Sequence, residues 1–194
     1  MSPVSGQKPR VFVSYRYEND EHTAWVQGFV RELETRVIDV VFDQYLDDRR
    51  KQAGGLTLTY SQRDGYITRL IGRMNYCHVF MPIFTPHYLA GIGYPEGKPI
   101  SGGPDVGWVF DEFQLSCARG AARLIETIPI LRRGDPRKLP PGFHAGNTLD
   151  LRNGLQNIVQ KLNGLCLYIH ERRLIATVPS MKEYEEFFGG DPWM

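Results

Sequence analysis

The chain is poor in cysteine, and its 3 cysteines, Cys77, Cys117 and Cys166, lie far apart in the sequence. Their spacing fits no metal-binding pattern, and an odd number of thiols cannot all pair in disulfides. Two of them lie in strongly apolar or helical stretches, as buried free thiols do. We therefore expect a reducing, cytoplasmic environment and no metal site.

The chain also lacks an excess of charge of either sign and any long apolar run. Its 23 Lys and Arg residues nearly balance its 22 Asp and Glu residues, so we expect neither a nucleic acid nor a membrane as a partner. No apolar run approaches the roughly 20 residues that cross a bilayer. With 194 residues, of which 42% are hydrophobic, the chain can form one globular domain with a real core.

Several familiar sequence motifs are missing as well. No G-x-G-x-x-G follows the first predicted strand, and neither a G-x-x-x-x-G-K-[ST] loop nor a G-x-S-x-G elbow occurs. These absences disfavour a Rossmann dinucleotide site, a P-loop NTPase and a hydrolase nucleophile. The acidic cluster and lysine of a response-regulator receiver are not found at the predicted strand ends, and the 5 histidines have no metal or triad spacing.

What the sequence does contain is an alternation of apolar strands and amphipathic helices. Short apolar stretches predict five strands, at residues 10–15, 37–42, 76–84, 124–131 and 148–151. Helical spacing of apolar residues is found between them, at residues 18–36, 61–74, 105–120 and 155–167. This alternation predicts an α/β, flavodoxin-like three-layer fold, with a five-stranded parallel sheet in the order 2-1-3-4-5 and helices on both faces.

The remaining segments are polar or rich in glycine and proline. Residues 1–9 predict a disordered leader, and residues 171–194 a C-terminal extension that we do not place in the core. Residues 44–60 and 85–106 predict long loops, the second with one possible helical turn at residues 88–90. Loops of this length in compact domains are usually functional or disordered.

In a sheet of this order, ligands bind beyond the carboxyl ends of strands 1 and 3, where the order reverses. The segments after Ser14, Phe42 and Phe84 share this rim, and the third helix starts there, with Asp105 placed to cap it. Trp108 and Glu112 are four residues apart and share one face of that helix. Taken alone, Glu112 fits a surface carboxylate beside a partly buried indole, but its position on the rim favours a binding site.

Four motifs, in the right order, resemble those of TIR (Toll/interleukin-1 receptor) domains. The run Val11–Arg16 (VFVSYR) resembles the first strand of that family, and Val40–Asp43 (VVFD) resembles the second, where an acidic residue opens the BB loop. Trp108–Glu112 (WVFDE) is similar to the W-V-x-x-E pattern of TIR domains that cleave NAD, whose Glu is catalytic. Ile128–Gly134 (IPILRRG) resembles the fourth strand and turn of bacterial members. We therefore expect a TIR domain over residues 10–170.

The resemblance implies an NAD glycohydrolase or ADP-ribosyl cyclase-type enzyme that cleaves the nicotinamide–ribose bond of NAD, in bacterial antiphage defence or immune signalling. NAD is then a substrate rather than a cofactor. The catalytic residue would be Glu112, because one carboxylate suffices to stabilise an oxocarbenium-like transition state. The candidate substrate-binding residues are Ser14, Tyr15, Arg16, Asp43 and Trp108.

Some of these residues have structural alternatives. Arg16 could contact the pyrophosphate of NAD or form a salt bridge with Glu18 or Asp43, and Asp43 could instead fix the loop that follows it. Trp108 could wall the ribose pocket or simply pack at the start of its helix. Arg132 and Arg133 could reach phosphate, but a solvated turn is the simpler interpretation.

The family resemblance also implies assembly. It predicts a homo-oligomer or filament formed through TIR–TIR contacts, and a separate effector or sensor protein as a further partner. Residues 44–60 form a longer and more charged segment than a typical BB loop. An alternative function is therefore a non-catalytic TIR interaction module that assembles through the segment from Asp43 to Tyr60.

Overall fold

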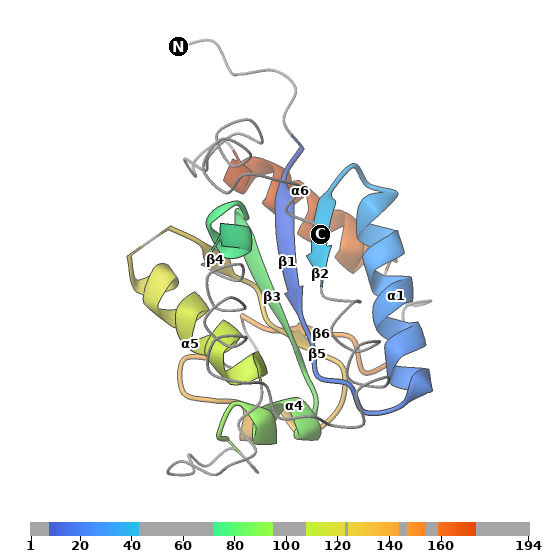
Figure 1. The fold of residues 1–194 in the computed structure, drawn as a ribbon. Helices are drawn as coiled ribbons and strands as arrows, with labels where there is room; N and C mark the ends of the chain where they lie inside the picture. The colour runs from blue at the N-terminus through green and yellow to red at the C-terminus, as the bar shows by residue number, and fades with distance from the viewer. Residues whose placement is uncertain are drawn as a thin grey trace, which may run out of the picture.

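The structure is a computed structural model that describes residues 8–42, 72–94, 108–122, 124–143, 147–153 and 159–173. Strands and helices are interspersed along the chain (Figure 1). The elements are β1 (Arg10–Ser14), α1 (Asp20–Glu34), β2 (Asp39–Phe42), β3 (Val79–Phe84), α4 (Pro86–Gly91), α5 (Trp108–Ala121), β4 (Glu126–Thr127), β5 (Ile130–Leu131), the short 3-10 helix η2 (Pro136–Lys138), β6 (Leu149–Asp150) and α6 (Val159–Arg173).

The strands form one parallel sheet in the order β2-β1-β3-β5-β6, and β4 also pairs with β3. Strands β4 and β5 both come from the fourth predicted strand, so this is the predicted order 2-1-3-4-5. The third strand is the most apolar, and it lies at the centre with all its residues buried. The predicted flavodoxin-like fold class is confirmed.

The fourth predicted strand, residues 124–131, is divided into β4 and β5, which is a correction to the sequence analysis. Both parts keep one register on β3, because Phe80 pairs with Thr127 and Ile83 pairs with Ile130. That register puts Pro129 opposite Pro82. Pro82 has no backbone N–H to donate to this strand, so the ladder is interrupted there, whereas the Pro129 carbonyl faces β6 and accepts from the Leu149 N–H at 2.9 Å.

Other element boundaries also differ from the predictions. Strand β2 begins at Asp39 rather than at residue 37, because Val37 has a left-handed φ of 63°. Helix α6 extends to Arg173 rather than ending at residue 167, since Ile169 continues its buried side. Residues 72–75 are helical as predicted. Pro9, within the predicted leader, is ordered, because its carbonyl accepts a hydrogen bond from the Asp39 N–H at 2.9 Å. Residues 1–7 of the leader, the 44–60 loop, the Asp105 cap, the rest of the 61–74 helix and the segment after residue 173 lie outside the described residues.

Helices cover both faces of the sheet, as predicted, and Figure 1 shows α1 and α5 on opposite sides of it. Side chains of β1 alternate between the two layers. Val11 and Val13 pack in the core under α1 and α6, whereas Phe12 packs in the core under α4 and α5. The alternation of the strand therefore assigns each β1 residue to one face.

An aromatic cluster joins the end of β3 to the helices beside it. Phe84 is fully buried, and its ring centroid lies 5.7 Å from that of Tyr88 on α4. It also lies 6.3 Å from the centroid of Phe113 on α5 and 5.6 Å from that of Phe143. Such tilted ring pairs add packing energy beyond burial alone. Phe84 therefore fixes α4 and α5 against the carboxyl end of the sheet.

The placement of two cysteines agrees with the sequence analysis. Cys77 and Cys166 are buried free thiols, and burial raises the pKa of Cys77 to about 12. The Cys77 thiol is therefore protonated and unreactive at neutral pH. No helix within the described ranges has both the length and the apolar character needed to cross a membrane.

Replacing Phe84 with alanine should lower the free energy of unfolding by about 3–5 kcal/mol, because it leaves a cavity among the aromatic rings. A Leu167→Ala variant is the control, since that side chain is 67% exposed and should change stability by no more than about 0.5 kcal/mol. Urea unfolding followed by circular dichroism measures both. A loss below about 1 kcal/mol for Phe84→Ala would contradict the role given to the aromatic cluster.

Candidate active site

A buried polar chain lies at the carboxyl end of β1. The hydroxyl of Ser14, the last residue of β1, donates a hydrogen bond to Oε2 of Glu112 at 2.5 Å, and its Oγ lies 2.8 Å from the phenol oxygen of Tyr88. The three side chains are at most 5% exposed. We call this group the Tyr88–Ser14–Glu112 chain.

The local sequence explains how α4 reaches this position. Thr85 follows β3 directly and caps α4, because its hydroxyl accepts a hydrogen bond from the Tyr88 backbone N–H at 3.0 Å. Pro86 occupies the first turn, where its missing N–H costs nothing. The helix therefore starts at the rim and turns Tyr88 toward the end of β1.

Helix α5 brings Glu112 to the same point from another part of the chain. Val109 and Phe113 bury their side chains in the core under α4 and α5, as the helical spacing predicted. Ser116 is also fully buried, and its hydroxyl donates to the Phe113 carbonyl at 2.7 Å. With this side of α5 fixed against the sheet, Glu112 projects toward Ser14.

The direction of the hydrogen bonds in the Tyr88–Ser14–Glu112 chain follows from the protonation of these three side chains. Burial and the neighbouring Glu112 charge raise the pKa of Tyr88 well above its ordinary value, so the phenol keeps its proton. The single hydroxyl proton of Ser14 goes to Glu112, because a carboxylate can only accept. Tyr88 must therefore donate its own proton to Ser14 Oγ.

Arg16 lies on the same face of the sheet as Glu112. Its guanidinium crosses Gly91, where an added Cβ would come within 2.6 Å of Arg16 Nη1 and 2.9 Å of Val109 Cγ2. Arg16 Nη1 also donates to the His87 carbonyl at 3.3 Å. Burial and the charge of Arg16 lower the pKa of His87, so that imidazole is neutral at pH 7. Only glycine at position 91 lets the arginine lie between α4 and the first turn of α5.

The other predicted site residues are placed differently. Tyr15 points to the α1 side of the sheet, where its ring centroid is 6.2 Å from that of His22. The structure therefore brings together Ser14, Arg16 and Glu112 but not the Tyr15 side chain. Trp108 is the first residue of α5, and the placement of its side chain lies outside what the structure describes, as does Asp43.

Sequence reasoning missed Tyr88 as a member of the site. It predicted a helical turn at residues 88–90, which α4 confirms, but gave the tyrosine no role. A tyrosine in an otherwise apolar turn was the available signal, since a buried phenol needs a hydrogen-bond partner. That partner, Ser14, is 74 positions away in the sequence, and no local pattern indicates such a pairing.

A second polar cluster lies at the same rim on the α1 side. Glu21 accepts hydrogen bonds from Arg132 at 2.8 Å and from Arg133, and Arg133 also lies 3.3 Å from Glu18. The side chains of Arg132 and Arg133 are 12% and 35% exposed. Both arginines are therefore held in ion pairs with the start of α1, at a turn that is partly exposed.

His22 is the buried centre of this second cluster. It is 0% exposed, and neither ring nitrogen has a hydrogen-bond partner among the described residues. Burial lowers the pKa of His22; Glu18 and Glu21 oppose this effect, whereas Arg133 and Arg132 add to it. The imidazole is therefore neutral in the folded protein, and its protonation opposes folding.

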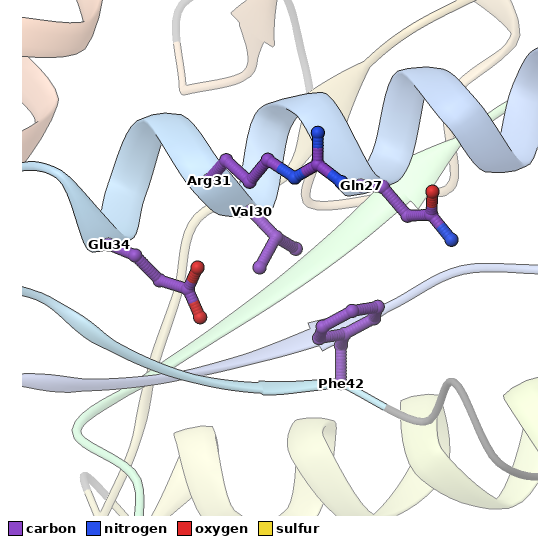
Figure 2. Close-up of a pocket in the computed structure, with 5 residues that line it drawn as sticks. All are labelled: Gln27, Val30, Arg31, Glu34 and Phe42. Atoms are coloured by element: carbon purple, nitrogen blue, oxygen red, sulfur yellow. The ribbon is translucent and has the colours of Figure 1, made fainter.

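A separate hollow of about 210 Å³ lies between α1 and the edge strand β2. Figure 2 shows the Phe42 ring and Val30 facing one another inside it, with Gln27, Arg31 and Glu34 along the helix. Sites for drug-sized ligands usually enclose about 300–1,000 Å³. The hollow is too small for a dinucleotide and lies on the opposite face of the sheet from α5. Within the described ranges, no three His, Cys, Asp or Glu side chains are placed to hold a metal ion.

The chain matches no protein-family model, and it matches no curated protein. A functional assignment for this chain therefore depends on the residues of the site and their geometry. Those residues are the buried Tyr88–Ser14–Glu112 chain and the arginine beside it.

His22 should make the fold sensitive to acid. The pKa of the free imidazole is 6.5, and burial lowers it in the folded protein. Below pH 6.5 the unfolded chain therefore binds more protons than the folded chain, and the free energy of unfolding decreases as the pH is lowered. At pH 5.5 this loss is at most about 1.4 kcal/mol for one histidine. A His22→Leu variant should therefore lose less stability than wild type between pH 7.5 and 5.5.

Urea unfolding at the two pH values measures the difference. The control is His87→Gln, which removes an exposed histidine at the same rim. This variant should reduce the loss of stability between the two pH values less than His22→Leu does, because the His87 imidazole is less desolvated. Equal losses in wild type and His22→Leu would show that His22 is not the source of the acid sensitivity.

Proposed function

We propose that this protein cleaves the bond between nicotinamide and ribose in NAD, with Glu112 as the catalytic residue. The observation that carries the proposal is the buried Glu112 carboxylate, which Ser14 holds at 2.5 Å at the carboxyl end of β1. This is the rim where sheets of this order bind ligands. The W-V-x-x-E resemblance of Trp108–Glu112 supports the same residue independently.

The chemistry needs little beyond one fixed negative charge. As the glycosidic C–N bond breaks, its electron pair moves to the nicotinamide ring nitrogen and neutralises the positive charge of that ring. The positive charge passes to C1′ and the ring oxygen of the ribose, as in other glycosidic cleavages. The leaving group is neutral, so no general acid is required.

The Glu112 carboxylate would act on the ribose side of that bond. A fixed carboxylate stabilises the developing positive charge and can orient the ribose hydroxyls by accepting their hydrogen bonds. Water then attacks C1′ and releases a proton, which gives ADP-ribose; attack by an adenine nitrogen would instead close a cyclic product. The neighbouring Asp111 projects about 100° away around the helix, so it does not share this role.

Arg16 is the residue we propose for the phosphate end of the substrate. Its guanidinium lies against Gly91, on the same face of the sheet as Glu112. A planar guanidinium matches phosphate oxygens with two parallel hydrogen bonds. The predicted roles of Asp43 and Trp108 at the substrate remain predictions, whereas the Tyr15 side chain lies on the α1 side of the sheet, away from Glu112.

The biological setting and the assembly are part of the same proposal. The resemblance to TIR domains supports a role in bacterial antiphage defence or immune signalling, as a homo-oligomer activated by a separate effector or sensor protein. An enzyme that acts only when assembled would be silent as a dilute protomer. The activity test therefore includes a crowding agent to favour assembly.

Purified protein incubated with NAD and a crowding agent should release nicotinamide, and Glu112→Gln should lower that rate by at least about 10²–10³-fold. The amide keeps the shape of the side chain but removes the charge that stabilises the transition state. Chromatography of the products measures the rate and separates ADP-ribose from a cyclic product. Circular dichroism checks that the variant remains folded.

The matched control is Asp111→Asn, which makes the same change at the next residue of α5 and should retain the wild-type rate. Full activity in Glu112→Gln would refute the catalytic role of Glu112. A wild-type protein that releases no nicotinamide even in the assembled state would refute the enzyme and leave the non-catalytic interaction module.

A further inference from the structure

We propose that Tyr88 is a positioning residue, which acts through Ser14 to fix the Glu112 carboxylate for reaction. This inference rests on the proposed function of Glu112 and adds to it. Tyr88 is 0% exposed, and its phenol lies 2.8 Å from Ser14 Oγ, which in turn donates to Glu112 at 2.5 Å. The two contacts form one continuous path from α4 through β1 to α5.

Ser14 alone would hold the carboxylate loosely. A serine hydroxyl rotates among staggered positions, and it can donate one hydrogen bond while accepting others. When Tyr88 donates to Ser14 Oγ, the Ser14 proton is left to point at Glu112 Oε2. Consecutive hydrogen bonds of this kind also polarise one another, so the second bond is strengthened by the first.

Burial makes this arrangement matter for the reaction. A carboxylate that is only 5% exposed has little water to stabilise its charge, so its hydrogen-bond donors decide how readily it stays ionised. A transition state with positive charge on the ribose needs Glu112 in the charged form. Weakening the donor to Glu112 should therefore reduce the ionised fraction and loosen the orientation of the carboxylate.

Helix α4 is the common support of the two polar arms of the site. Tyr88 and Gly91 are three residues apart, which places them as neighbours on one face of the helix. Tyr88 contacts Ser14, and Gly91 contacts Arg16, which follows Ser14 by two positions in the sequence. The Thr85 cap and the packing of Tyr88 on Phe84 hold this helix on the end of β3.

The first test is Tyr88→Phe, which removes only the phenol oxygen and keeps the ring against Phe84. We expect kcat for nicotinamide release to fall about 3- to 10-fold, the effect of one hydrogen bond. KM should change little, because Tyr88 does not touch the substrate. The acid limb of the pH profile should move to higher pH, since the donor to Glu112 is weakened.

The second test asks whether Tyr88 acts through Ser14. Ser14→Ala should lower kcat more strongly, on the order of 10²-fold, because Glu112 Oε2 loses this donor directly. Adding Tyr88→Phe to Ser14→Ala should then have no further effect on kcat or on the pH profile. Such non-additivity is expected when two residues act along one path.

The matched control is Tyr168→Phe. The Tyr168 phenol donates to Glu126 Oε1 at 2.8 Å, so the variant removes the same kind of bond between α6 and β4. It should leave both kcat and the pH profile unchanged. A general loss of stability would affect this control as well, and thermal unfolding of each variant measures that loss.

A readout that does not need catalysis separates this inference from the proposed function. Carbon-13 NMR of the glutamate side-chain carboxyls, with Glu112→Gln to assign the signal, follows the titration of Glu112 directly. Ser14→Ala should move that titration to higher pH, Tyr88→Phe should move it less, and the double variant should match Ser14→Ala. If wild type releases no nicotinamide, the proposed function fails and this titration alone decides the positioning role.

Two results would overturn the inference. One is a Tyr88→Phe variant with an unchanged pH profile and an unchanged Glu112 titration. The other is a Tyr88→Phe effect of the same size in the Ser14→Ala background as in wild type, which would mean that Tyr88 acts independently of Ser14.

Discussion

The rest of this site depends on one constraint, which is that a carboxylate cannot be buried without hydrogen-bond donors. Glu112 satisfies this constraint with a hydrogen bond from Ser14 of β1. The Ser14 hydroxyl must itself be held in one rotamer, and Tyr88 of α4 lies beside it. Tyr88 reaches Ser14 because the short helix α4 starts immediately after β3. The Thr85 cap and the packing of Tyr88 on Phe84 hold α4 in this position.

Much of the architecture could be predicted from the sequence because the signals are local and periodic. The five apolar stretches and the stripes of α1 and α5 follow directly from residue spacing. The division of the fourth strand could not be predicted, because it arises at Pro82, which belongs to the neighbouring strand β3. The same holds for Arg132 and Arg133, whose carboxylate partners lie more than 100 residues earlier.

The candidate site likewise contains some residues that could be predicted from the sequence and others that could not. Its location at the rim and the candidates Ser14, Arg16 and Glu112 followed from topology and from motifs that lie within single elements. Tyr88 and Gly91 became visible only when α4 was placed against β1, since their partners belong to a different strand. The candidate residues that lie within single motifs were therefore easier to find than the residues that hold them in position.

The alternation of β1 has a consequence for how this protein can change over evolution. Ser14 and Arg16 lie on the α4 side of the sheet, and Tyr15 between them lies on the α1 side. Inserting or deleting one residue in this strand would exchange the two faces, so that the serine would enter the apolar core and the tyrosine would face the carboxylate. A single-residue change in the length of this strand would therefore disrupt core and site together.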